Sequence, residues 1–212
     1  MYIVLGVIVI FLVVFLVWGI ASRRHSLPCP TWLGWLVELD NPFAKNSRAD
    51  VIVTHLDVQP GMSVLDAGCG PGRVTVPLAI QVGPAGRVTA VDIQTGMLEH
   101  ARKKAQTANL SNIEYVHAGI GDGKLGLARY DRALLVTVLG EIPDRRAALQ
   151  EIFTALKPGG MLSVTEIIFD PHFQSRSTVA QLANDIGFQE QAFFGNAFAY
   201  TLNLTRPLSQ AA

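Results

Sequence analysis

Short apolar runs alternate with amphipathic segments along most of this 212-residue chain, and this alternation limits its fold more than any other feature. Each apolar run is nearly continuous, which is typical of strands in a parallel sheet that helices cover on both faces. The sequence therefore predicts an α/β fold with a doubly wound, Rossmann-like sheet. The predicted strands are 63–66, 87–92, 113–118, 131–138 and 161–168, and the predicted helices are 47–56, 73–82, 95–110, 147–156 and one that begins at Thr178.

The C-terminal part of the chain predicts an antiparallel β-hairpin. A Gly195-Asn196 turn separates the segments 188–194 and 197–205, and apolar residues alternate with smaller or polar ones from Phe198 to Leu204. We therefore expect the sheet to be mostly parallel and to end in a C-terminal antiparallel hairpin.

Capping patterns predict where two of the helices begin. Ser47 and Asp50 form an S-x-x-D start for the first helix, and Thr178 with Gln181 forms a capping box for the last one. Gly187 is placed to close the last helix, because glycine tolerates the left-handed conformation with which many helices end.

A glycine-rich loop follows the first predicted strand, with the sequence D-A-G-C-G-P-G over 66–72. Gly68 and Gly70 let the backbone turn sharply and approach a ligand, and the next helix offers free N–H groups. A dinucleotide fingerprint would need a glycine at position 73, where this chain has Arg73. A carboxylate at Asp66 would also repel a pyrophosphate, whereas it suits an ammonium group. The loop therefore argues against a nicotinamide dinucleotide.

Asp92 ends the second predicted strand, where it is placed to accept hydrogen bonds from both hydroxyls of a ribose. At this point the motifs carry a resemblance. VLDAGCGPG followed by VTAVDI resembles motif I and the second-strand acidic motif of class I S-adenosylmethionine-dependent methyltransferases. DRALLVTVLGEIPD resembles their fourth-strand segment, and LKPGG with MLSVTEI resembles the entry to their fifth strand. The likeness covers about 47–207 and is nearest to the ubiquinone/menaquinone-biosynthesis-like methyltransferases.

The resemblance implies a seven-stranded sheet and S-adenosylmethionine as the cofactor. It places Asp66 near the methionine ammonium group, either directly or through a water molecule. Gly68, Cys69 and Gly70 are then expected to line the methionine portion through their backbone. Asp92 is expected to bind the ribose.

The same resemblance implies how the rest of the cofactor is held. Ile93 is expected to pack on the adenine. Gly119 and Ile120 occupy the stretch where relatives bind the adenine amino group, which leaves backbone groups or Asp122 as its partner. Thr137 is expected to lie beside the sulfonium, at the end of the fourth strand.

Four side chains at the expected rim of the site are candidates for acceptor chemistry: Glu141, Glu166, Asp170 and His172. We select Glu141 and His172 as the catalytic candidates, and each also fits a hydrogen-bonding role at the rim. A general base is needed for a phenol or a carbon acid but hardly for a thiolate. Many relatives carry a histidine where Glu141 stands. None of these residues shows metal-ligand spacing, so we expect no metal site.

The first 22 residues contain no charged side chain. The segment 2–21 is long enough to span a hydrocarbon core of roughly 30 Å as one transmembrane helix. A cleaved signal peptide and a helix lying in the membrane interface are the alternatives. Arg23 and Arg24 follow the run, which by the positive-inside rule places the remainder of the chain in the cytoplasm.

The sequence thus divides into an anchor over 1–22, a Pro/Trp-rich juxtamembrane linker or lid over 23–46 and a methyltransferase domain over 47–212. Basic and acidic residues balance at 17 each, which argues against a nucleic-acid-binding surface. We predict a single-pass membrane enzyme that methylates a small hydrophobic acceptor, such as a quinone, lipid, isoprenoid or thiol. Membrane lipid is its expected neighbour. The alternative is a catalytically silent S-adenosylmethionine-binding scaffold at the membrane.

Overall fold

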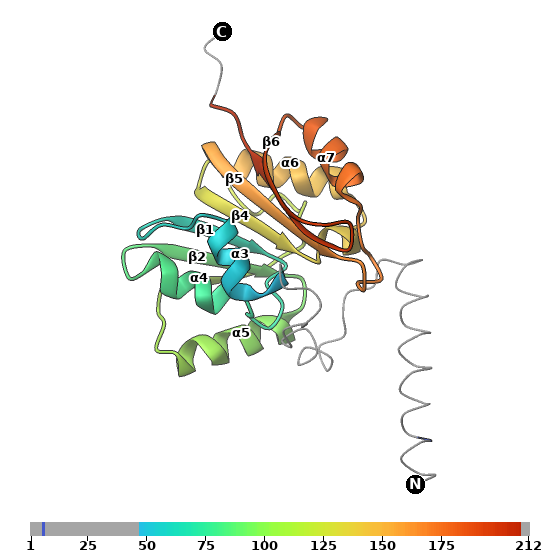
Figure 1. Ribbon diagram of the computed structural model, residues 1–212. Coiled ribbons are helices and arrows are strands. Elements are labelled where there is room, and N and C mark those ends of the chain that lie inside the picture. Colours follow the sequence, from blue (N-terminus) through green and yellow to red (C-terminus); the bar gives the residue numbers. More distant parts are fainter. Residues whose placement is uncertain (1–5, 7–46, 209–212) are drawn as a thin grey trace.

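A computed structural model of the chain describes residue 6 and residues 47–208 (Figure 1). These residues form one seven-stranded sheet in the order β3-β2-β1-β4-β5-β7-β6. The pairs among β1 to β5 are parallel, and β7 runs antiparallel to both β5 and β6. The predicted Rossmann-like sheet with a C-terminal antiparallel hairpin is therefore confirmed.

The strands are β1 Ser63–Ala67, β2 Arg87–Asp92, β3 Ile113–His117, β4 Tyr130–Val136, β5 Leu156–Ile167, β6 Gln189–Gly195 and β7 Ala199–Thr205. The helices are α3 Ala49–His55, α4 Thr75–Val82, α5 Thr95–Thr107, the short 3-10 turn η3 Leu139–Glu141, α6 Arg145–Ala155 and α7 Arg176–Asn184. Each predicted strand and helix from 47 onward is present, with ends that shift by a few residues.

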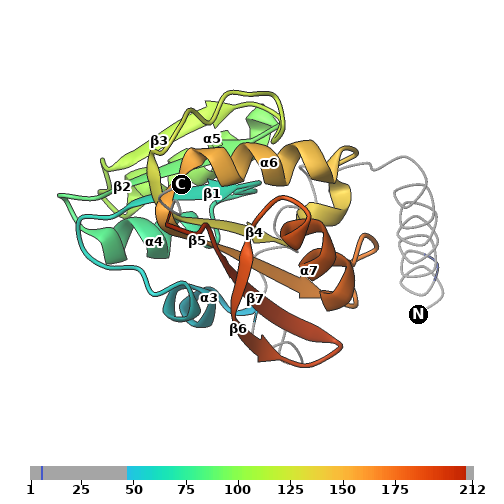
Figure 2. The same ribbon diagram turned by 90° about the horizontal axis from the view of Figure 1, so that it is seen from above.

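The sheet separates two apolar cores, which explains why its strands read as nearly continuous apolar runs. Val64 packs with side chains of α3 and α4, whereas its neighbour Leu65 packs with side chains of α6 and α7. Successive strand residues point to opposite faces, so β1 needs apolar residues at both positions. In Figure 2, α6 and α3 lie on opposite sides of β1 and β4.

The predicted cap of the first helix is wrong. The N-cap of α3 is Arg48, whose side chain makes no capping bond. The Ser47 carbonyl instead accepts a hydrogen bond from Arg73 Nη1 at 2.6 Å, and Asp50 pairs with Arg48 at 3.2 Å. The helix thus begins after Arg48, one residue later than the predicted S-x-x-D start requires.

The predicted start of the last helix is also wrong. Ser175 is the N-cap of α7, and its Oγ accepts a hydrogen bond from the Thr178 backbone N–H at 3.2 Å. The helix begins earlier because Ser175 satisfies this N–H, so Thr178 lies inside the first turn. Gly187 does close the segment: it has φ +113° and donates to the carbonyls of Ala183 and Asn184.

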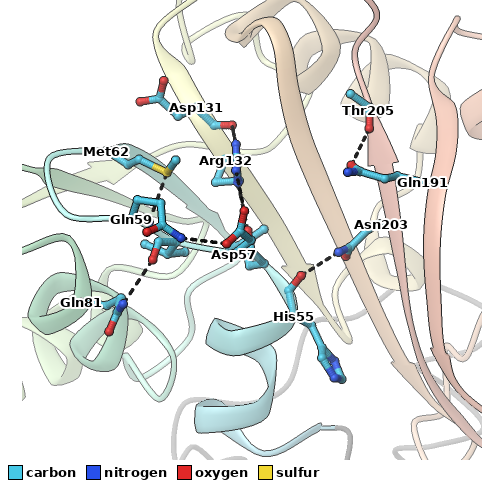
Figure 3. Close-up of polar contacts among 12 residues, drawn as sticks. His55, Asp57, Gln59, Met62, Gln81, Asp131, Arg132, Gln191, Asn203 and Thr205 are labelled. Carbon is cyan, nitrogen blue, oxygen red and sulfur yellow. Dashed lines mark hydrogen bonds and ion pairs between the residues drawn. The ribbon is translucent and has the colours of Figure 1, made fainter.

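Polar contacts fix the C-terminal end of α3 to the sheet (Figure 3). Arg132 on β4 donates through Nε to the Leu56 carbonyl at 2.9 Å and pairs with Asp57 at 3.4 Å. Asn203 on β7 donates to the His55 carbonyl at 2.7 Å. Because α3 ends over the sheet in this way, its N-terminal end points toward the edge where the parallel strands end.

Among the described residues, no helix is both long and apolar enough to cross a membrane. The predicted span over 2–21 and the predicted linker over 23–46 lie, apart from Gly6, outside the described residues. Both remain predictions from the sequence.

Candidate functional site

The glycine loop after β1 folds back onto β2. The backbone N–H groups of Gly68 and Cys69 both donate to the Val91 carbonyl, at 2.8 and 2.9 Å. Gly68 has φ +73°, and a Cβ at this position would lie 2.5 Å from Val138 Cγ2. Only glycine fits both the left-handed backbone and the close approach of Val138. The loop is therefore held between the ends of β1, β2 and β4.

Asp92 joins the glycine loop to the turn that begins α5. Its Oδ2 accepts a hydrogen bond from the Gly70 N–H at 2.9 Å, and its Oδ1 accepts one from the Gln94 N–H at 2.8 Å. Burial raises the pKa of this carboxyl, and the two backbone N–H bonds act in the opposite direction. Each carboxylate oxygen has a further lone pair, so Asp92 retains the capacity to accept bonds from ribose hydroxyls.

Asp66 lies beneath the loop and is almost fully buried. Its Oδ2 accepts a hydrogen bond from Thr75 Oγ1 at 2.6 Å. Burial raises the pKa of Asp66 to about 6, an effect that the Thr75 bond partly offsets. A cation beside a buried carboxyl stabilises its charged form, so the position fits the ammonium group of the cofactor.

Cys69 lies beside these two carboxyls in the glycine loop. Burial is the main cause that raises the pKa of its thiol, and the negative charges of Asp66 and Asp92 add to it. The thiol is therefore protonated and a poor nucleophile. This agrees with the expectation that Cys69 contacts the cofactor through its backbone and not through its thiol.

The predicted adenine-binding residues follow β2 and β3. Ile93 is 60% exposed, and its carbonyl lies 2.8 Å from His117 Nε2. The Gly119 N–H donates to Asp122 Oδ2 at 2.9 Å, and Ile120 is half-buried against the core. An adenine amino group needs an acceptor, and the Asp122 carboxylate is the side-chain acceptor at this position.

Thr137 directly follows β4 and has φ +54°, an uncommon conformation for a β-branched residue. Its backbone N–H donates to the Thr165 carbonyl at 2.8 Å, and its hydroxyl donates to the Val136 carbonyl at 2.7 Å. Strained residues of this kind cluster at functional sites. The predicted site residue is thus held in a strained conformation beside β5, which the sequence alone did not indicate.

The structure brings the two catalytic candidates together at the ends of β4 and β5. His172 Nδ1 lies 3.8 Å from Glu141 Oε1 and 3.6 Å from Asp170 Oδ1. Asp170 Oδ1 also accepts a hydrogen bond from the His172 backbone N–H at 2.7 Å. These contacts connect the segment after β4 to the segment after β5.

Glu166 at the end of β5 is the most strongly perturbed acid of this rim. It is 1% exposed, and its Oε2 accepts a hydrogen bond from the Gln174 N–H at 3.1 Å. Its Oε1 is buried without a hydrogen-bond partner. Burial raises the pKa of Glu166 to about 8, and the charge of Asp170 adds to this, so the group is largely protonated at neutral pH.

Within 47–208, no group of three or more His, Cys, Asp or Glu side chains could together hold a metal ion. The site described above therefore consists of a glycine loop with two buried carboxyls on β1 and β2, and a rim of acids with one histidine on β4 and β5.

A family model described as "Methyltransferase domain" matches residues 64–160, which include the glycine loop, Asp92 and the segment after β4. This match covers a little less than half of the chain. With the sheet order, it shows that residues 64–160 are similar to the methyltransferase domain of S-adenosylmethionine-dependent methyltransferases.

Two relatives of this methyltransferase domain illustrate how far the likeness extends. An uncharacterized 37.1 kDa protein in transposon TN4556 of Streptomyces fradiae is 35% identical over 154 residues, 71% of this chain and 43% of that protein. Demethylmenaquinone methyltransferase of Listeria welshimeri is 34% identical over 106 residues, 50% of this chain and 45% of that protein. The chain spans less than half of the length of either relative.

Solved structures share the fold of the methyltransferase domain. An S-adenosylmethionine-dependent methyltransferase from Aquifex aeolicus has a TM-score of 0.74 and 19% identity over 84% of this chain and 99% of its own. The [4+2]-cyclase SpnF has a TM-score of 0.68 and 16% identity over 76% of this chain and 80% of its own. These similarities concern the fold alone.

Asp92→Asn is expected to weaken cofactor binding. The change leaves the shape but removes the charge that holds the Gly70 and Gln94 N–H groups, and such charge-assisted bonds contribute about 1.5–3 kcal/mol each. We expect the Kd for S-adenosylhomocysteine, measured by calorimetric titration, to rise more than about ten-fold.

The matched control is Asp131→Asn. Asp131 also accepts a backbone hydrogen bond, from Ser63 at 2.9 Å, but at the opposite edge of the sheet. Its substitution is expected to leave the Kd unchanged. Equal affinities of the two variants would contradict the assignment of Asp92.

Glu166→Gln is expected to alter how stability depends on pH. The folded-state pKa of Glu166 is about 8 instead of the ordinary 4.5, so the folded protein holds more protons than the unfolded chain between these values. The free energy of unfolding therefore falls as pH rises through this window. The range from pH 6.5 to 9 lies above the pH at which Asp66 titrates. Over this range, the free energy of unfolding should fall by at least about 1 kcal/mol less in the glutamine variant than in the original chain.

Urea unfolding followed by circular dichroism measures this difference. Glu99→Gln is the control, because Glu99 is exposed on α5. The same pH dependence in the Glu166 variant and in the original chain would show that Glu166 is not a buried neutral acid.

Proposed function

We propose that this chain is a membrane-anchored methyltransferase that moves a methyl group from S-adenosylmethionine to a small hydrophobic acceptor. The single observation that carries the proposal is the hydrogen bond from the Gly70 N–H to Asp92 Oδ2 at 2.9 Å. It joins the glycine motif and the acidic motif into one site, with the buried Asp66 beneath it. An arrangement with these three features fits a ligand that has both an ammonium group and a ribose.

The cofactor, when bound, supplies a methyl group already activated by the sulfonium charge. The work of the chain is then to bind and to orient. Asp66 would hold the ammonium group and Asp92 the ribose, so the reactive end of the cofactor would face the ends of β4 and β5. Positioning the acceptor in line there and excluding water would lower the barrier to methyl transfer.

The acid-histidine rim supplies a place for the proton when the acceptor is a phenol or a carbon acid. We propose that His172 or Glu141 accepts it, since the His172 ring lies 3.8 Å from the Glu141 carboxylate. The bond from the His172 backbone N–H to Asp170 fixes the position of this histidine. A thiolate acceptor would need no base, and the same groups would then only orient it.

Two observations favour a hydrophobic acceptor. The uncharged segment 2–21 would hold the enzyme at a bilayer, where lipid-dissolved molecules are concentrated. The Listeria relative is a demethylmenaquinone methyltransferase, which makes a quinone our first choice over a lipid, an isoprenoid or a thiol. Arg23 and Arg24 favour a single span with the catalytic domain in the cytoplasm.

The alternative is a scaffold that binds the cofactor without turnover. It is favoured by Glu141, which stands where many relatives carry a histidine. The fold alone does not decide between the two, because one fold hosts many activities.

The test uses the full chain in vesicles of phosphatidylcholine and phosphatidylglycerol that contain demethylmenaquinone, with methyl-labelled S-adenosylmethionine in the buffer. We expect label in the extracted quinone, and no label with Asp92→Asn. The assay is then repeated with a total bacterial lipid extract in place of the quinone. Intact binding of S-adenosylhomocysteine without label in either acceptor preparation would contradict the proposal and favour the scaffold.

A further inference from the structure

Three large apolar side chains are exposed together at one corner of the sheet. Ile168 is 41% exposed, Phe169 is 71% exposed and Phe198 is 63% exposed. The Ile168 N–H donates to the Phe198 carbonyl at 2.7 Å, so the segment after β5 is fixed to the turn between β6 and β7. We call these three residues the apolar corner.

The apolar corner adjoins the acceptor rim directly. Asp170, which follows Phe169, donates its N–H to the Ile167 carbonyl at 2.9 Å and accepts from the His172 N–H. The turn that exposes Phe169 is therefore the same turn that positions His172. A surface that touches the apolar corner would lie at the mouth of the proposed acceptor site.

The N-terminal segment joins the domain at this same edge of the sheet. Arg73, directly after the glycine loop, donates to the Ser47 carbonyl at 2.6 Å. From there α3 runs back over the sheet, as its contacts with β4 and β7 require. In Figure 1 the N-terminal end of the cyan helix α3 lies on the side to which the strand arrows of β1 and β2 point. Ser47, with which the described domain begins, thus lies at the edge that carries the apolar corner, and the apolar segment 2–21 precedes it in the sequence.

The opposite edge of the sheet has a different character. It carries ion pairs between Asp57 and Arg132 and between Asp131 and Lys157. Leu127 and Leu208 are also exposed there, but scattered exposed apolar residues are ordinary features of protein surfaces. The edge where the parallel strands end carries the acids of the site, but it is also the edge where two phenylalanines and Ile168 are exposed side by side. The clustered apolar side chains fit a domain that faces lipid with this edge.

We propose that the apolar corner inserts into the surface of a lipid bilayer and docks the mouth of the acceptor site on the membrane. The proposal rests on the proposed function and deepens it: the acceptor would pass from lipid to the rim of Glu141 and His172 without crossing water. Aromatic side chains with an apolar neighbour are typical of membrane-interface contacts.

The size of the apolar corner favours lipid over a second copy of the chain. One partner in a standard protein interface contributes about 800 Å². An aromatic residue contributes about 150–250 Å² when its whole surface is buried. Phe169 and Phe198 are only partly exposed and Ile168 less so, and these three side chains therefore fall short of that area.

The test places a tryptophan at the apolar corner of the full chain. Trp18, Trp32 and Trp35 are first replaced by phenylalanine, and Phe169→Trp is added. The probe is a vesicle of phosphatidylcholine and phosphatidylglycerol whose acyl chains are brominated near the headgroup. Bromine quenches tryptophan fluorescence only at short range, so we expect strong quenching and a blue shift. The control is Leu127→Trp at the opposite edge, where we expect neither. Equal fluorescence in brominated and plain vesicles for Phe169→Trp, or equal quenching at both positions, would overturn the proposal.

A second measurement separates this proposal from the proposed function. In Phe169→Ser/Phe198→Ser, transfer to demethylmenaquinone in vesicles is expected to fall about ten-fold, while transfer to a short-chain, water-soluble quinone and the Kd for S-adenosylhomocysteine stay unchanged. Equal rates for both acceptors in this variant would overturn the docking role. If the original chain methylates neither acceptor, the proposed function fails. Strong quenching of a tryptophan at position 169 would still support membrane docking in that case.

Discussion

The Asp92 carboxylate is the interaction on which the site depends. It accepts hydrogen bonds from Gly70 in the loop after β1 and from Gln94 in the turn after β2. Both turns lie at the edge where the parallel strands end. Without the Asp92 carboxylate their N–H groups would have no acceptor there, and the two turns would be less well ordered. One side chain therefore gives two loops a fixed relation and still offers lone pairs to a ligand. Asp66, which is buried nearby and accepts a hydrogen bond from Thr75, is the second carboxyl of the site.

That edge of the sheet unites features that lie far apart in the sequence. It carries the cofactor loop after β1 and the strained Thr137 after β4. It also carries the rim around His172 and the apolar corner, which lie after β5 and in the turn between β6 and β7. The chain also enters there, through the contact of Ser47 with Arg73. The same side of the molecule would thus bind the cofactor and admit a lipid-dissolved acceptor. The edge with the Asp57–Arg132 and Asp131–Lys157 ion pairs would face away from the membrane.

Periodicity and glycine placement in the sequence were enough to predict the sheet and the position of the glycine loop, because apolar runs and φ-positive glycines are local signals. The caps were not predictable in the same way. Ser47 and Thr178 have capping residue types, but Arg48 is the N-cap of α3 and Ser175 is the N-cap of α7. The raised pKa of Glu166 and the left-handed Thr137 result from packing between β4, β5 and the segment before α7. No pattern of residues along the chain reports such packing.

Hydrogen exchange of the full chain tests most directly the central claim that the Asp92-linked loops form the cofactor site. With saturating S-adenosylhomocysteine, the amides of Gly70 and Gln94 should exchange more slowly. The Ser63 amide, which donates to Asp131 at the opposite edge, should exchange at an unchanged rate. Unchanged exchange at Gly70 and Gln94, despite bound ligand shown by titration of the same sample, would contradict this account.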